Sequence, residues 1–85
     1  MLHARKDYNE RIQDLAQEIP EDEPVFLIRG QDLVGHMAVR AYAHLHRVNG
    51  GSDTVYLAAM AHADRMEAWT KSRKCKLADM PPVLA

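Results

Sequence analysis

Two long stretches of the chain carry side chains at helical spacing, and a short glycine-containing turn separates them. In the first stretch, residues 31–49, apolar positions recur every three or four residues: Val34, Met37, Ala41, Leu45 and Val48. In the second stretch, residues 52–72, the same spacing is kept by Val55, Ala59, His62, Met66 and Trp69. Because this spacing places side chains on one face of an α-helix, the pattern predicts two amphipathic helices, each with one buried stripe.

Helix-ending signals lie on both sides of the turn. The sequence Asn49-Gly50-Gly51 tolerates the left-handed backbone that closes a helix, and Ser52 or Asp53 can cap the helix that follows. Asp32 or a neighbouring residue is the expected cap of the first helix. A turn this short makes the two helices antiparallel neighbours, so the sequence predicts a helical hairpin.

The residues before the hairpin are predicted to form a short helix and an extended arm. Tyr8, Ile12 and Leu15 recur at helical spacing, which predicts a helix within residues 1–18. Residues 19–30 are expected to be extended, because the two prolines of this segment restrict both their own backbone and that of the preceding residues.

The residues after the hairpin, 73–85, are basic and then proline-containing, and they are expected to be a flexible tail that closes at Pro81-Pro82. The chain as a whole, residues 1–85, is therefore predicted to be a single all-α domain.

A chain of 85 residues that consists of a hairpin and an arm is too small to bury a large core alone. Alanine and glycine are abundant on both predicted helices, which leaves little side-chain bulk for a monomeric core. Further apolar residues lie off the two stripes: Leu33, Val39, Tyr42, Tyr56, Leu57 and Met60. We expect these residues to form a second buried face at a subunit interface of a homo-oligomer.

Charge and composition exclude several functional classes. The chain has eleven basic and twelve acidic residues, whereas proteins that bind duplex nucleic acid are strongly basic. No segment approaches the roughly 18 apolar residues that span a bilayer, and the charged N-terminus lacks the apolar core of a signal peptide. The single cysteine, Cys75, is compatible with a reducing cytosol. These features predict a cytosolic protein that binds neither membranes nor duplex nucleic acid.

The sequence contains no recognisable catalytic or metal-binding motif. Its histidines lack the spacing of four residues that zinc enzymes use: His44 and His46 lie two apart, and His36 and His44 lie eight apart. His62 and Asp64 are near neighbours without a second cluster to complete a phosphohydrolase site. The sequence therefore predicts no enzyme, no metal and no cofactor.

The series Arg5-Lys6-Asp7-Tyr8-Asn9, then Pro20-x-Asp22-Glu23-Pro24-Val25-Phe26-Leu27-x-Arg29-x-Gln31-Asp32, and finally His62-Ala63-x-x-Met66-x-x-Trp69, resembles the phage anti-CBASS sponge family. The hairpin is similar to the helical domain of the phage anti-Thoeris sponges. The resemblance implies a homohexamer in the host cytoplasm. It also implies that the protein sequesters cyclic di- or trinucleotides, or signals of the cyclic ADP-ribose type, without cleaving them.

The resemblance also assigns candidate ligand-binding residues. It implies that Tyr8 stacks on a base and that Asn9 makes a polar contact. Arg65 matches a phosphate-binding arginine of the last helix, and Val25 stands where members that bind cyclic trinucleotides have a threonine. Glu23 stands where members that bind cyclic dinucleotides have a lysine, and a carboxylate there opposes a phosphodiester by roughly 1 kcal/mol.

Three further residues complete the candidate set: Arg11, Phe26 and Arg29. Each arginine also has a structural alternative, since Arg11 can pair with Asp7 and Arg29 with Asp32, and Tyr8 can be an interface aromatic. The alternative function is that of a small helical oligomeric module for protein–protein interaction, without a nucleotide ligand.

Overall fold

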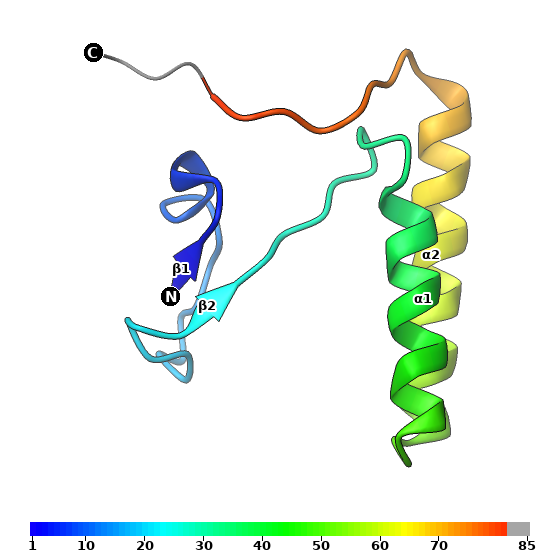
Figure 1. The fold of residues 1–85 in the computed structure, drawn as a ribbon, viewed down its shortest axis with the longest axis horizontal. Coiled ribbons are helices and arrows are strands. Elements are labelled where there is room, and N and C mark those ends of the chain that lie inside the picture. The colour runs from blue at the N-terminus through cyan, green and yellow to red at the C-terminus, as the bar shows by residue number, and fades with distance from the viewer. Residues whose placement is uncertain (82–85) are drawn as a thin grey trace. The chain divides into compact units, whose positions relative to one another are not determined.

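The computed structural model describes residues 1–81, in which two helices and one small pair of strands are formed (Figure 1). The elements follow in the order β1 (Leu2–His3), a 3₁₀-helix (Lys6–Tyr8), β2 (Pro24–Val25), α1 (Gly35–Val48) and α2 (Asp53–Ser72). The chain divides into two compact units. The N-terminal unit comprises Met1–Leu27 and the segment that begins at Asp79, and the hairpin unit comprises Ile28–Ala78.

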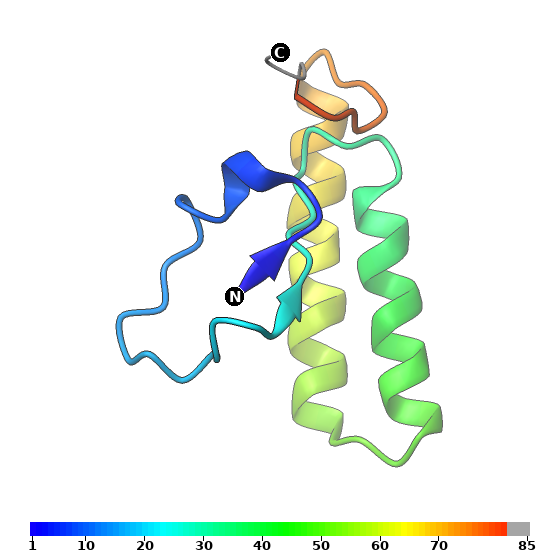
Figure 2. The same cartoon turned by 60° about the vertical axis from the view of Figure 1, so that its left-hand side comes forward.

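In the hairpin unit, α1 and α2 lie side by side and antiparallel, as both views show (Figures 1 and 2). The turn uses the residues that the sequence indicates: Gly50 has a positive φ of 87°, and the Ser52 hydroxyl accepts a hydrogen bond of 3.2 Å from the Val55 amide. The predicted pair of helices is therefore present, and the second helix has nearly the predicted bounds.

The first helix starts later than predicted, at Gly35 instead of residue 31. Residues before it form a turn in which the Asp32 carboxylate accepts a hydrogen bond of 3.0 Å from the Val34 amide. The Asp32 carbonyl accepts another, also of 3.0 Å, from the Gly35 amide. The residue at the cap position is Val34, and no side chain caps the helix there, so the expected side-chain cap by Asp32 is not formed. The Asp32 side chain instead bonds within the preceding turn.

The faces that pack inside the hairpin differ from the predicted stripes. Ala43 of α1 and Ala63 of α2 are fully buried, and Gly35 and Met66 are also buried. In contrast, the predicted stripe of α1 is open: Met37 is 57% exposed, Leu45 62% and Val48 83%. The prediction of the buried face was wrong because small side chains let two helix axes approach closely, and they lie on the opposite face of α1.

The residues predicted to lie at a subunit interface differ in exposure. Val39, Tyr56 and Met60 are half-buried within the hairpin unit. Leu57, in contrast, is 63% exposed. On α2, the predicted stripe is buried only in part, since Met66 is buried whereas His62 and Trp69 are exposed.

An ionic cluster links the two helices along one side. Arg40 of α1 lies 2.9 Å from the Asp64 carboxylate and 3.7 Å from that of Glu67, both on α2. His36 Nδ1 lies 3.4 Å from Glu67, and Lys71 lies 3.4 Å from the same residue. Because several of these groups are largely exposed, the cluster contributes little to stability.

The N-terminal unit contains no α-helix in residues 1–18, where one was predicted. Side chains compete there for backbone groups: the Asp14 carboxylate accepts hydrogen bonds from the amides of Glu18, at 3.2 Å, and Ile19, at 3.0 Å. Gln17 adopts a left-handed backbone with a φ of 54°. Local bonds of this kind offer the backbone an alternative to a helix, so only the 3₁₀-helix Lys6–Tyr8 forms.

The segment after α2 is held to the loop before α1. The Lys76 carbonyl accepts a hydrogen bond of 3.0 Å from the Leu33 amide, and the Lys76 amide donates one of 3.2 Å to the Gln31 carbonyl. The first part of the predicted flexible tail is therefore attached by backbone bonds. The Pro81-Pro82 step, at which the tail was expected to close, lies only partly within the described residues.

Candidate functional site

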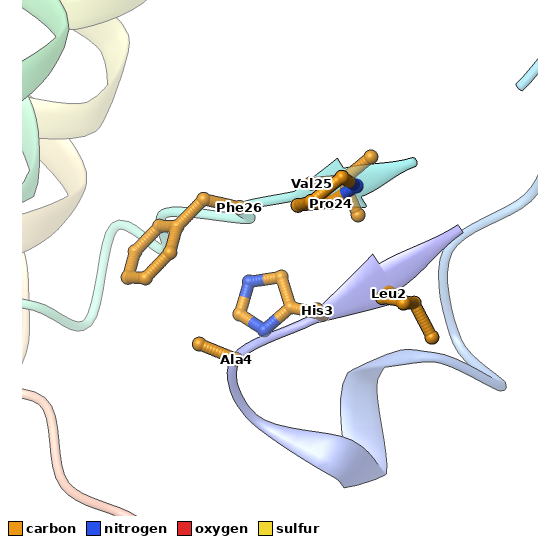
Figure 3. A pocket seen from close by; sticks show the side chains of 6 residues that line it. All are labelled: Leu2, His3, Ala4, Pro24, Val25 and Phe26. Atoms are coloured by element: carbon orange, nitrogen blue, oxygen red, sulfur yellow. The ribbon is translucent and has the colours of Figure 1, made fainter. Parts of the chain in front are cut away.

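An open hollow of about 480 Å³ lies in the N-terminal unit, beside the two strands (Figure 3). The strands pair in parallel, with Leu2 opposite Pro24 and His3 opposite Val25. This pairing brings the first residues of the chain against the proline-rich arm. The hollow is lined by six residues: Leu2, His3, Ala4, Pro24, Val25 and Phe26.

His3 holds this unit together. It is buried, and its backbone amide donates a hydrogen bond of 2.6 Å to the Asn9 side-chain oxygen. Its Nδ1 accepts a hydrogen bond of 2.8 Å from the Arg5 amide, and its Nε2 accepts one from the Leu27 amide. A neutral imidazole has one acceptor nitrogen, so the ring serves one of these two amides at a time. This engagement makes His3 a structural residue and leaves no free nitrogen to act as a base.

Two aromatic rings flank His3, and they differ in accessibility. The Phe26 ring lies 4.9 Å from His3, tilted by 35°, and Phe26 is 73% exposed at the hollow (Figure 3). The Tyr8 ring meets His3 edge-on at 5.1 Å, and Tyr8 is only 6% exposed. The position that the resemblance assigns to base stacking is therefore packed inside this unit, and Phe26 is the aromatic surface that a ligand can reach.

Two guanidinium groups lie near the Tyr8 ring, that of Arg5 at 4.7 Å and that of Arg11 at 5.8 Å from its centroid. Arg5 donates to Asp7 at 2.7 Å and lies 3.3 Å from the Asp79 carboxylate. The hydrogen bond from Arg5 lowers the pKa of Asp7. Asp7 thus pairs with Arg5, whereas the sequence alternative paired it with Arg11.

The other candidate residues divide between the two units. Glu23 is exposed and precedes the lining residue Pro24, and its carbonyl accepts a hydrogen bond of 2.8 Å from the Leu2 amide. Val25 lines the hollow, and Asn9 is bound to His3. Arg29 and Arg65 belong to the hairpin unit, where both are exposed, Arg29 before α1 and Arg65 on α2.

Sequence reasoning missed four residues that line the hollow: Leu2, His3, Ala4 and Pro24. In the sequence, His3 stands out only as one of several possible metal ligands. Its role depends on a pairing between residues far apart in the chain, and two-residue strands leave no alternating pattern that would indicate such a pairing.

Within residues 1–81, no three histidine, cysteine, aspartate or glutamate side chains lie close enough together to hold a metal ion. In the same part of the chain, neither helix has the length and apolar character required to cross a membrane. Comparisons with protein-family models, curated proteins and solved structures find no match for this chain. Functional inference therefore rests on the residues of the chain itself.

Proposed function

We propose that the chain binds cyclic oligonucleotide second messengers in the cytoplasm of a phage-infected cell and sequesters them without cleavage. The observation that carries the proposal is the exposed Phe26 ring, which stands beside His3 at an open hollow. An accessible aromatic face beside a hollow suits a nucleobase, because every base has a π-face that stacks on such a ring. The motif around this ring is also the part of the chain that most resembles the anti-CBASS sponges.

The charges around the hollow favour some ligands over others. Glu23 is exposed next to Pro24, and a carboxylate at this rim repels a phosphodiester. The rim therefore favours contacts to bases and ribose hydroxyls over contacts to phosphate. Arg29 and Arg65, which are exposed in the hairpin unit, are proposed to bind the phosphates of a cyclic trinucleotide at a separate class of site.

Sequestration acts by mass action and needs no reactive group, because bound ligand is removed from the free pool in proportion to the number of sites. The one acceptor nitrogen of the neutral His3 ring is taken by a backbone amide, which favours binding over turnover at the hollow. A homohexamer would multiply the sites, and we include this assembly in the proposal. The open apolar stripe of α1 supports self-association.

A direct test is the fate of the ligand. The purified chain should retain cyclic di-AMP or cyclic tri-AMP through gel filtration, and heat denaturation should release the nucleotide intact. Chromatography and mass spectrometry of the released material measure both properties. A linear product that accumulates with time would show an enzyme, and passage of both nucleotides without retention would contradict the sponge.

The charge of the rim gives a second test. Glu23→Lys should tighten the binding of cyclic di-AMP roughly 30-fold, because it removes a repulsion of roughly 1 kcal/mol and adds an attraction of about the same size. Glu21→Lys is the matched control, since it changes net charge equally from an exposed position three residues before Pro24. Calorimetry on both variants separates the two effects. Weaker binding by Glu23→Lys would show that the carboxylate is itself a ligand contact.

The open stripe of α1 also favours a second candidate, a helical module that docks on another protein. This candidate predicts no retained nucleotide, so the retention experiment distinguishes the two functions.

A further inference from the structure

An uncharged apolar stripe runs along the outer face of α1: it begins at Val34, the residue just before the helix, and continues with Met37, Ala41, Leu45 and Val48. At 3.6 residues per turn, Ala41 lies about 160° around the helix from Ala43. Ala43 is fully buried on the side of α1 that faces α2, whereas Leu45 is 62% exposed and Val48 83%. Inside the hairpin unit the stripe therefore faces away from α2.

The spacing of the stripe is symmetric about Ala41. Apolar residues lie seven and four positions before it, and four and seven positions after it. We propose that this stripe binds a second copy of the chain, antiparallel, with Ala41 of both copies at the two-fold axis. Such an isologous contact requires one surface to be complementary to itself, which a symmetric stripe provides.

The side chains suit this register. Met37 of one copy shares a layer with Leu45 of the other, and Val34 shares a layer with Val48. At the axis two identical side chains meet, and the small Ala41 lets the helix axes approach to about 8–10 Å. The larger side chains of Met37 and Leu45 then fill the space between the helices on both sides of Ala41.

The charges of α1 also favour a like partner. Arg40 lies 2.9 Å from Asp64, and the Arg47 guanidinium lies 4.6 Å from the centroid of the Tyr56 ring, so α2 engages both arginines. His44, the titratable residue beside the stripe, lies 5.5 Å from the same Tyr56 ring. Because these groups contact α2, two identical stripes can meet without bringing unpaired like charges together.

The antiparallel direction follows from the ends of the helix. A parallel pair would align two helix dipoles and gather His46 and Arg47 of both copies at one end. The antiparallel pair opposes the dipoles instead, and it places the basic C-terminal turns of the two copies at opposite ends of the contact. This arrangement specifies the self-association that the proposed function includes, but it does not depend on nucleotide binding.

Ala41→Glu tests the contact, because it places two carboxylates at the axis. Ala61→Glu is the matched control: Ala61 is an exposed alanine that precedes the fully buried Ala63 by two residues, as Ala41 precedes Ala43. We expect light scattering to show that Ala41→Glu lowers the oligomer mass by at least half, while Ala61→Glu keeps the wild-type mass. Circular dichroism verifies that both variants remain helical.

An unchanged mass for Ala41→Glu would overturn the inference while leaving an oligomer and nucleotide binding intact. An equal loss of oligomer mass in Ala41→Glu and Ala61→Glu would also overturn the inference, because the stripe would then have no special role in the contact. A monomeric wild type would overturn the inference together with the proposed hexamer. Nucleotide retention is measured separately, so failure of the sponge function is distinguishable from failure of the contact.

Cysteine crosslinking tests the direction in a Cys75→Ser background. In the antiparallel pair the two copies of residue 34 lie about 21 Å apart, so neither Val34→Cys nor Val48→Cys alone should form a disulfide dimer. The double variant should form one, because the thiol introduced at position 34 of each copy would meet the thiol at position 48 of the other. Crosslinking by either single variant, or none by the double variant, would overturn the antiparallel arrangement.

Discussion

Replacement of Gly35 by alanine should destabilise the protein, although it removes a glycine from a helix. Helix propensity alone would raise the free energy of unfolding by up to about 1 kcal/mol. A Cβ atom at residue 35, however, would lie 2.6 Å from the Arg29 carbonyl oxygen, 3.0 Å from Ile28 Cγ2 and 3.3 Å from the Met66 methyl group. A backbone carbonyl cannot rotate away as a side chain does, so α1 or the preceding loop must shift.

We expect Gly35→Ala to lower the free energy of unfolding by about 1–3 kcal/mol, the usual cost of overpacking. Urea unfolding followed by circular dichroism at a fixed protein concentration measures it. Gly30→Ala is the matched control, because the atoms nearest to its Cβ would be those of Trp69, at an ordinary 3.5 Å. That variant should stay within about 0.5 kcal/mol of the wild type. A Gly35→Ala protein as stable as the wild type would contradict this account of the close approach.

The helical hairpin could be predicted from the sequence because its signals are local. Gly50 supplies the left-handed turn, and the Ser52 hydroxyl caps the next helix from three residues away. These interactions involve neighbours in the chain, and they form wherever the same residues occur in the same order. The bounds of α2 could therefore be predicted almost directly from these local signals.

The buried face of α1 could not be predicted in the same way, because α1 is apolar on two sides. Periodicity identifies the stripe with the larger residues, such as Met37 and Leu45, as the buried one. The structure instead packs Gly35 and Ala43 inside the hairpin, where close approach of the backbones requires small side chains. A stripe that pattern analysis identifies as core is thus left open, which is the expected arrangement when a core is completed by another chain.

The candidate site depends on contacts that no local pattern encodes. His3 accepts a hydrogen bond from the Leu27 amide, which is 24 residues away in the chain. The parallel strands that bring the two residues together are only two residues long. Helical spacing of Tyr8 and Ile12 predicted a helix there, but hydrogen bonds that the Asn9 and Asp14 side chains accept from backbone amides hold another conformation. The sequence identified Phe26 and Val25 through the arm motif, whereas His3 required the structure.

Phe26→Ala should weaken nucleotide binding more than any other single change at the hollow. Stacking of one base on an aromatic ring contributes about 1–3 kcal/mol, so the dissociation constant should rise roughly 5- to 150-fold. Because Phe26 is 73% exposed, its removal should leave the fold of the N-terminal unit largely unchanged. Calorimetry with cyclic di-AMP and cyclic tri-AMP measures the loss, and Phe26→Trp should retain binding.

The contrast with Tyr8 makes this prediction specific. Tyr8 is 6% exposed and packs edge-on against His3, so Tyr8→Ala removes a core ring and should lower thermal stability together with binding. Phe26→Ala should lower binding alone. If Phe26→Ala binds both nucleotides as tightly as the wild type, the hollow is not the base-stacking site. If Tyr8→Ala then loses binding while its thermal unfolding is unchanged, Tyr8 contacts the ligand directly, and its burial against His3 must be relieved when the ligand binds.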